Sequence, residues 1–238
     1  MTSLYQTRDL ARALSACSLL QGLDAAPLQQ LASQARVVEA EEDGLILDGE
    51  DGSSDVYFVL RGSVRVTVRT EGGVETILGD FAEGSFFGEM AAIDAAPRSA
   101  RIVATTRARL ARVSASAFLD LVFTSPQTCH RLLQLLSGRI RASNARLLEN
   151  AALHSRHRLH AELLRQAKPR PDGSLGVSPP PTGADLAARI GVRREAVSRE
   201  MAEITRRGWV RATRGTLILV EPDQLRAAVA AGMRGEDA

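Results

Sequence analysis

The 238-residue sequence predicts an α+β fold in which antiparallel β-structure is followed by a long helix and then by a small helical domain. Three observations predict this order. Short apolar runs alternate with turn residues between Val37 and Val113, a heptad spacing of apolar residues begins at Ser125, and two short helical runs flank Gly191. We therefore expect three parts, covering residues 1–125, 126–154 and 155–238.

The first part begins with a helical period over residues 7–35, which Gly22 and Pro27 break into two expected short helices. The apolar runs that follow recur every 8–12 residues, a spacing typical of an antiparallel sandwich or barrel. These runs are Leu45–Leu47, Val56–Leu60, the alternating Val64, Val66 and Val68, Val74–Leu78 after a Gly72-Gly73 turn, Ile102–Ala104 and Leu110–Val113.

The long helix carries a heptad seam, formed by Leu133, Leu136, Ile140, Ser143, Leu147, Asn150 and His154. Such a seam requires a partner helix, and the simplest partner is the same helix in a second copy of the chain. The polar seam residues, such as Ser143 and Asn150, can fix the register of the two helices or contact a ligand at the interface. A break near Leu153–His154 predicts a hinge before a further helix at His157–Gln166.

The last part starts with the Pro- and Gly-rich connection Lys168–Pro181, within which Leu175–Val177 suits one short strand. The elements expected after it are a capping box at Thr182–Asp185, helices at Leu186–Ile190 and Arg193–Arg206 around the Gly191 turn, and a hairpin of Trp209–Ala212 with Thr216–Val220.

Charge is segregated along a chain whose net charge is only +2. Residues 1–125 carry −6, whereas 126–165 and 166–220 carry +5 each, which favours an anionic partner for the second half. Cys17 and Cys129 are too few for a disulfide framework or an iron–sulfur cluster, and the four histidines lack the spacing of a metal site. No nucleophile–base pair indicates an enzyme. With neither a signal peptide nor a membrane-spanning run, we expect a cytoplasmic protein without metal or membrane partner.

The stretch Phe86–Ala100 suits a buried phosphate. A Gly88-Glu89 pair opens a turn, Arg98-Ser99 closes it, and small residues lie between them, so that backbone N–H groups, a guanidinium and a hydroxyl can bind one anion. A carboxylate such as Glu89 can accept a hydrogen bond from a sugar hydroxyl. The stretch resembles the phosphate-binding cassette of cyclic-nucleotide-binding domains, and Asp55–Val64 resembles a strand–Gly–strand segment of their β-roll. The alternative is an empty roll in which Glu89 and Arg98 form a salt bridge.

The stretch Asp185–Arg199 resembles the helix-turn-helix of the catabolite-activator/FNR family of transcription regulators. Small and apolar residues at Ala187, Gly191 and Val197 allow its two helices to cross closely. Arg194, Glu195, Ser198 and Arg199 fall on one face of the second helix, and the resemblance implies base contacts from Arg194, Glu195 and Arg199. Phosphate contacts are expected from Thr182, Arg193, Arg206 and Arg214, which are better placed for them. The alternative is a merely solvated, charged helix face.

The resemblance covers nearly the whole chain and implies a β-roll, a long dimerisation helix and a C-terminal winged helix-turn-helix. It implies a homodimeric regulator that responds to cAMP or cGMP, binds a pseudo-palindromic double-stranded DNA operator and has RNA polymerase as a partner. The ligand residues it implies are Gly88, Glu89, Met90, Ala91, Arg98, Ser99, Arg139, Ser143 and Asn144. Asn144 departs from the serine of the family, so the base, adenine or guanine, stays open.

Two further alternatives are a member of the same family gated by another effector or by none, and a cyclic-nucleotide module of a signalling enzyme. An FNR-type oxygen sensor would need a cysteine cluster that the sequence lacks, and a haem sensor would need an axial ligand near the roll, where no histidine precedes His130. A signalling-enzyme module would share the roll but not the winged helix at Thr182–Val220.

Overall fold

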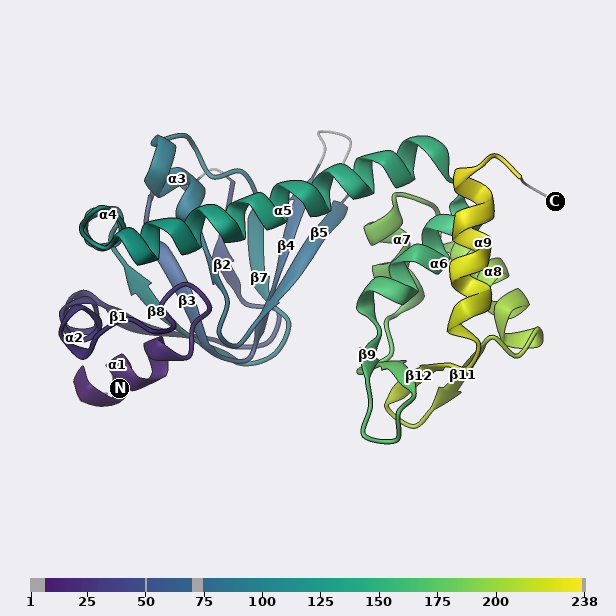
Figure 1. Ribbon diagram of the computed structural model, residues 1–238, viewed down its shortest axis with the longest axis horizontal. Coiled ribbons are helices and arrows are strands. Elements are labelled where there is room, and N and C mark those ends of the chain that lie inside the picture. The colour runs from purple at the N-terminus through teal and green to yellow at the C-terminus, as the bar shows by residue number, and fades with distance from the viewer. Residues whose placement is uncertain (1–6, 50, 70–74, 237–238) are drawn as a thin grey trace. The chain divides into compact units, whose positions relative to one another are not determined.

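The computed structural model describes residues 7–49, 51–69 and 75–236 (Figure 1). The chain divides into two compact units, residues 1–139 and 140–238. The Gly72-Gly73 turn and Val74 lie outside the described residues. Each unit is described below by itself.

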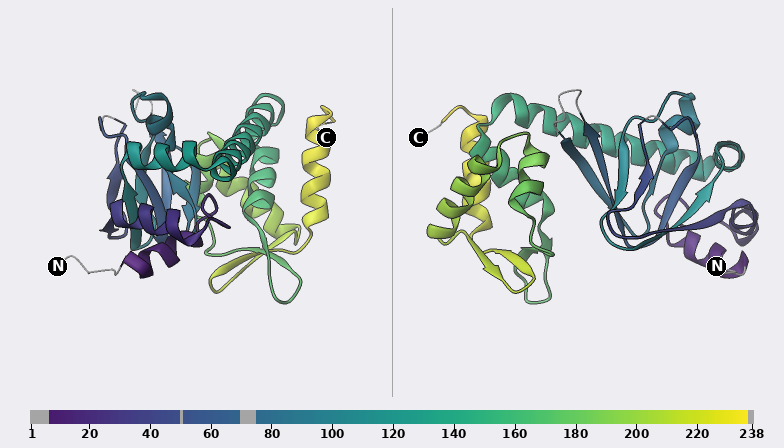
Figure 2. Two further views of the ribbon diagram at one scale, coloured as in Figure 1. Left: turned by 60° about the vertical axis from the view of Figure 1, so that its left-hand side comes forward. Right: turned by 180° about the vertical axis from the view of Figure 1, so that it is seen from behind.

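The first unit contains two four-stranded antiparallel sheets, with strand orders β1-β8-β3-β6 and β2-β7-β4-β5 (Figures 1 and 2). The strands are β1 (Arg36–Ala40), β2 (Leu45–Leu47), β3 (Val56–Arg61), β4 (Ser63–Arg69), β5 (Glu75–Ala82), β6 (Phe86–Phe87), β7 (Arg101–Ala104) and β8 (Ala108–Val113). The expected antiparallel architecture is confirmed.

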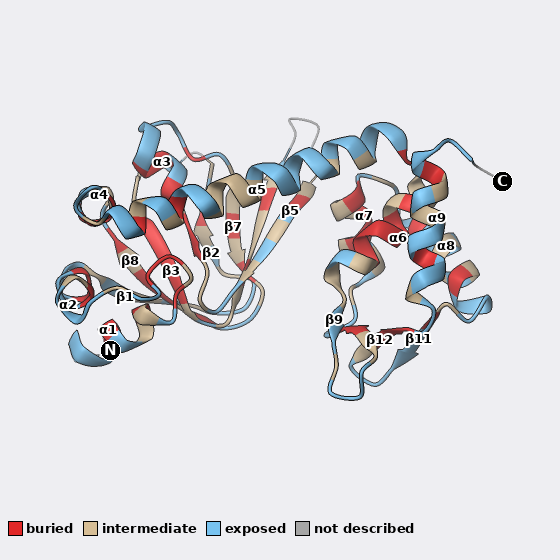
Figure 3. Ribbon diagram, viewed as in Figure 1, coloured by how far each residue is buried: buried red, intermediate tan, exposed pale blue. Residues whose placement is uncertain are grey.

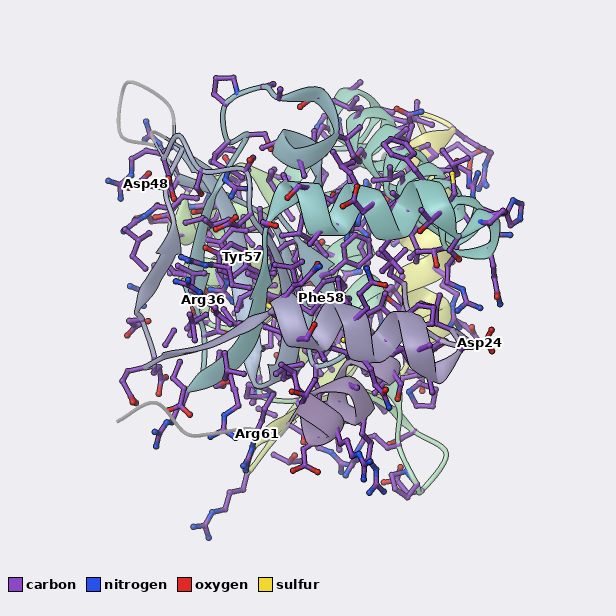
Figure 4. The ribbon with its side chains drawn as sticks, turned by 90° about the vertical axis from the view of Figure 1, so that its left-hand side faces the viewer. Asp24, Arg36, Asp48, Tyr57, Phe58 and Arg61 are labelled. Atoms are coloured by element: carbon purple, nitrogen blue, oxygen red, sulfur yellow. The ribbon has the colours of Figure 1, made fainter. Side chains whose placement is uncertain are left out.

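Strand β3 separates two apolar cores because successive side chains of a strand point to opposite faces. Phe58 packs with the helices of the unit, while Tyr57 and Val59 pack with Val64 and Leu110 inside the roll. Figure 4 labels the neighbouring Tyr57 and Phe58 on this strand. Burial on both faces explains why β3 reads as a continuous apolar run rather than an alternating one.

Helices cover one side of this unit. They are α1 (Thr7–Ser15), α2 (Ala25–Gln34), α3 (Glu89–Asp94), α4 (Ala115–Thr124) and the first half of α5 (Pro126–Ala152). The two N-terminal helices are confirmed, but Pro27 lies in the first turn of α2 rather than breaking a helix, since a first-turn proline removes no intrahelical hydrogen bond. Helix α4 was not predicted; Ser114 caps it by accepting a hydrogen bond from the backbone N–H of Ala117.

The second unit combines helices with a small antiparallel sheet of order β11-β12-β10-β9. Its elements are the rest of α5, α6 (Ser155–Gln166), β9 (Lys168–Pro169), β10 (Leu175–Val177), α7 (Gly183–Ile190), α8 (Arg194–Arg206), β11 (Val210–Thr213), β12 (Thr216–Leu219) and α9 (Pro222–Met233). The predicted helix-turn-helix and hairpin are confirmed. Helix α9 was not predicted; its Leu225 is fully buried in the core of the unit.

Helix α5 exposes most of the predicted seam, although Leu136 is half-buried against the core of the first unit (Figure 3). Leu133, Ile140 and Leu147 leave 59%, 61% and 67% of their surface exposed, although each is a large apolar residue. The helix ends at Ala152 and α6 begins at Ser155, so the break expected near Leu153–His154 is present. Among the described residues, no helix is both long and apolar enough to span a membrane.

Candidate functional site

The turn that opens the cassette depends on Gly88. This residue caps the N-terminus of α3 with a φ of 86°, a conformation that favours glycine. A Cβ at position 88 would also lie 2.7 Å from the carbonyl oxygen of Asp55 and 2.9 Å from Nη1 of Arg98. Glycine at this position therefore permits both the turn and the close approach of Arg98.

Arg98 is 7% exposed, and three contacts hold its outer edge. Its Nη1 donates to the carbonyl oxygen of Gly88 at 3.0 Å, and its Nη2 donates to Oγ of Ser53 and to the carbonyl oxygen of Asp55, both at 2.9 Å. Ser53 is oriented in turn by Asp51, which accepts from both its backbone N–H and its hydroxyl. The loop between β2 and β3 thus holds the guanidinium in place.

One donor of Arg98 remains unused. Its Nε is buried and has no hydrogen-bond partner among the described residues. An unsatisfied buried donor of a charged group is costly unless something else accepts from it. Arg98 is therefore a preorganised cation with a free N–H, a donor suited to an anion.

The remaining cassette residues surround this cation in different ways. Ala91 is buried, whereas Met90 and Ser99 are exposed. The hydroxyl of Ser99 lies 3.8 Å from the sulfur of Met90, a weak contact that leaves it available to a stronger acceptor. The cassette thus combines one buried cation with an accessible hydroxyl.

Glu89 pairs with Arg139 rather than with Arg98. Its carboxylate is 3% exposed, and Oε1 accepts from Nη1 of Arg139 at 2.5 Å. Burial raises the pKa of Glu89, and the positive charge of Arg139 partly opposes this shift. The proposed Glu89–Arg98 salt bridge of an empty roll is therefore not present, because the carboxylate has a different partner from α5.

Ser143 and Asn144 are exposed on the part of α5 that belongs to the second unit. The ligand role of these two residues stays a prediction.

In the second unit, a helix-turn-helix is built from α7 and α8. Thr182 caps α7 by accepting the backbone N–H of Asp185 at 3.0 Å, as the capping box predicted. Gly191 ends α7 in the left-handed conformation, with a φ of 65°. The buried Ala187 and Val197 contribute to the core of the unit.

Besides Arg206, all seven residues expected to contact DNA are exposed: Thr182, Arg193, Arg194, Glu195, Ser198, Arg199 and Arg214. Four of them are arginines for which the described residues provide no ion pair. Arg206, by contrast, donates to both carboxylate oxygens of Glu203, so it is less available to a phosphate than the sequence suggested. An acid three residues before an arginine on a helix was the signal for this pair.

A contact that was not predicted from the sequence anchors α8. Nε2 of His160, a residue only 3% exposed on α6, lies 2.7 Å from Oε1 of Glu200. This hydrogen bond lowers the pKa of Glu200. Trp209 meets the ring of His160 edge to face at 5.9 Å. The residue that follows Arg199 is therefore fixed to the core of the unit.

Comparison with known proteins matches both halves of the chain. A family model for the cyclic nucleotide-binding domain covers residues 37–125, and one for the Crp-like helix-turn-helix domain covers residues 157–228. Among curated proteins, the cyclic AMP receptor protein of Thermus thermophilus is 32% identical over 68% of this chain and 73% of its own length. A CRP-like cAMP-activated global transcriptional regulator of Mycobacterium tuberculosis is 24% identical over 89% of this chain and 96% of its own length.

Solved structures show the same fold. A CRP/FNR-family transcriptional regulator from Thermus thermophilus is 25% identical, with a TM-score of 0.64 over 82% of this chain and 98% of its own. The c-di-GMP responsive global regulator CLP of Xanthomonas campestris has a TM-score of 0.71 at 22% identity, over 82% of this chain and 99% of its own.

A cyclic nucleotide-binding domain followed by a Crp-like helix-turn-helix defines a class of DNA-binding transcription regulator. The chain belongs to the CRP/FNR family of transcription regulators.

Proposed function

We propose that this protein is a homodimeric transcription regulator that binds a cyclic nucleotide, cAMP in the first instance, and responds to it by binding operator DNA. The observation that carries the proposal is Arg98, a buried and preorganised guanidinium whose Nε has no partner among the described residues. A cyclic phosphate carries one negative charge and accepts several hydrogen bonds, which matches this donor.

In the proposed complex, the phosphate is bound by Arg98, the hydroxyl of Ser99 and backbone N–H groups near Gly88–Ala91. Met90 adds apolar contact at the edge of the site. Glu89 accepts a ribose hydroxyl, since it is an ionisable acceptor buried beside the turn. Arg139 approaches the same carboxylate from α5, and Ser143 and Asn144 meet the base.

The names of the relatives support cAMP as the ligand. Those from Thermus thermophilus and Mycobacterium tuberculosis are called a cyclic AMP receptor and a cAMP-activated regulator. The amide of Asn144 can donate and accept, so cGMP is the second candidate. A regulator of the same fold is called c-di-GMP responsive, so the fold alone does not determine the effector.

The dimer is proposed from the exposed seam of α5. Leu133, Ile140 and Leu147 are spaced by seven residues and leave more than half of their surface exposed, which a second copy of the helix would cover. A two-fold dimer then carries two copies of α8 and reads half-sites one helical turn apart, about 34 Å.

On DNA, Arg194, Glu195, Ser198 and Arg199 are proposed to contact base edges, and Thr182, Arg193 and Arg214 to contact phosphates. The exposure of the four arginines and the absence of an ion pair for them among the described residues support these roles. We place the protein with its DNA in the cytoplasm and include RNA polymerase among its partners.

Isothermal titration calorimetry of the full chain with cAMP, cGMP and c-di-GMP tests the ligand. Binding of cAMP or cGMP that also tightens operator binding supports the proposal. Heat with c-di-GMP alone, or with none of the three, would overturn it in favour of a family member gated by another effector or by none.

A further inference from the structure

Arg139 is held by more than its ion pair with Glu89. Its guanidinium carbon lies 4.8 Å from the centroid of Phe81 and 4.8 Å from that of Phe86. Its Nη2 donates to the carbonyl oxygen of Phe86 at 2.9 Å. The cation therefore has contacts with two aromatic rings and one carbonyl, none of which involves the carboxylate.

Both rings are fixed by further aromatic contacts. Phe81 lies against Phe87 at 6.5 Å with an interplanar angle of 13°, and Phe87 stacks on Tyr57 at 5.2 Å with an angle of 4°. Phe86 packs against Phe58 at 6.2 Å. The chain has six phenylalanines, and four of them take part in this assembly, in which Phe81 and Phe86 contact Arg139.

The proposed function sets a problem for Arg139. If a ribose hydroxyl donates to Glu89, the carboxylate shares its acceptor capacity between the sugar and the guanidinium. A cation held by Glu89 alone would then depend on a carboxylate that also serves the sugar. The aromatic faces and the carbonyl of Phe86 attract the guanidinium equally with or without the nucleotide.

We propose that Phe81 and Phe86 are positioning residues of the cyclic-nucleotide site, which keep Arg139 on the β-roll while Glu89 accepts the ribose. This inference rests on the proposed function. The arrangement suits an arginine, since a planar guanidinium presents a face to a ring while its edge donates to both Glu89 and Phe86.

The test is a double-mutant cycle in the full chain. Phe81→Leu, Arg139→Gln and the double variant are titrated with cAMP by calorimetry, and their melting temperatures are recorded without nucleotide. If Phe81 acts through Arg139, Phe81→Leu weakens cAMP binding about threefold to tenfold in the natural chain and less than about twofold when residue 139 is glutamine. The decrease in melting temperature caused by Phe81→Leu is also smaller when residue 139 is glutamine.

Two matched variants separate this role from general packing. Phe81→Tyr retains an aromatic face and should bind cAMP within about twofold of the natural chain. Phe123→Leu changes an exposed phenylalanine outside the assembly and should have no effect on affinity. Phe81 is chosen because it is half-buried, so its truncation is less disruptive than that of the buried Phe86.

The outcomes are distinct. Equal penalties of Phe81→Leu on cAMP affinity in both backgrounds would overturn the positioning role and leave the proposed function intact. Absence of cAMP and cGMP binding by the natural chain would overturn the proposed function, and the nucleotide role of Phe81 and Phe86 with it.

Discussion

The two units use arginine in opposite ways. In the first unit Arg98 is 7% exposed, and carbonyl and hydroxyl oxygens fix its guanidinium. In the second unit Arg194, Arg199 and Arg214 are exposed, and the described residues provide no ion pair for any of them. A buried guanidinium is desolvated before its ligand arrives, whereas an exposed one exchanges water and counterions for phosphate or base.

This contrast predicts different responses to substitution. Loss of a buried, preorganised cation should weaken the binding of one ligand strongly, and the size of that effect should not depend on the salt concentration. Exposed cations should have smaller individual effects, and those that contact phosphates should depend on ionic strength. The largest effect of all is expected at the exposed seam of α5, the proposed dimer interface.

Ile140→Asp should separate the subunits and abolish specific DNA binding. A carboxylate buried without a partner costs several kcal/mol, and a two-fold interface contains the change twice. Sedimentation velocity and operator titration measure the outcome. Leu45→Asp, a matched change at an exposed apolar residue of β2, is the control. An intact dimer of the Ile140 variant would show that this seam is not the interface.

Arg98→Ala should weaken cyclic-nucleotide binding by about 2–4 kcal/mol, or 30- to 1000-fold, because the buried phosphate loses its cation. Salt-dependent non-specific DNA binding should persist, since the second unit is unchanged. Calorimetry and melting temperature are measured together, with Arg61→Ala as an exposed control. A lower melting temperature with unchanged nucleotide affinity would contradict the cassette assignment.

Arg199→Ala should relax discrimination at one base pair of each half-site by about 1–3 kcal/mol. Arg214→Ala should weaken all sequences alike and reduce the salt slope by about one. Titrations of both variants against a panel of altered operators at several salt concentrations distinguish the two roles. Identical profiles would refute the separation into base and phosphate contacts.

Ser53→Ala removes one of the two acceptors of Arg98 Nη2 while leaving the phosphate donors in place. We expect nucleotide binding to weaken by about 0.5–1.5 kcal/mol, the net value of one hydrogen bond. Ser54→Ala is the neighbouring control. An unchanged affinity for the Ser53 variant would mean that the loop does not preorganise Arg98.

The smallest effect concerns Glu200. Because His160 lowers the pKa of Glu200 below its usual 4.5, this contact adds stability above that pH and loses it as the pH falls through the lower folded-state value. Glu200→Gln should therefore flatten the acid limb of the stability curve by about 1 kcal/mol. Urea unfolding between about pH 3 and pH 6 measures this, with Glu42→Gln as an exposed control. An unaltered acid limb would argue against the contact.

Turns and helix ends that depend on neighbouring residues were predicted correctly from the sequence. Gly88 was expected to open a turn and does so at the start of α3, and Thr182 with Gly191 located both ends of α7. These features depend on residues close together in the chain, where capping, turn geometry and helical period determine the backbone. Helices α4 and α9 were not predicted, although Ser114 precedes α4 and Pro222 begins α9, and both residues are helix-start signals.

By itself, then, the sequence determined the order of roll, long helix and helix-turn-helix, because each depends on local periodicity and turn chemistry. The tertiary structure decided which charges meet. Glu89 pairs with Arg139, 50 residues away, and His160 with Glu200, 40 residues away. Such partners are set by strand register and helix packing, which bring distant residues together, and no pattern of neighbouring residues encodes them.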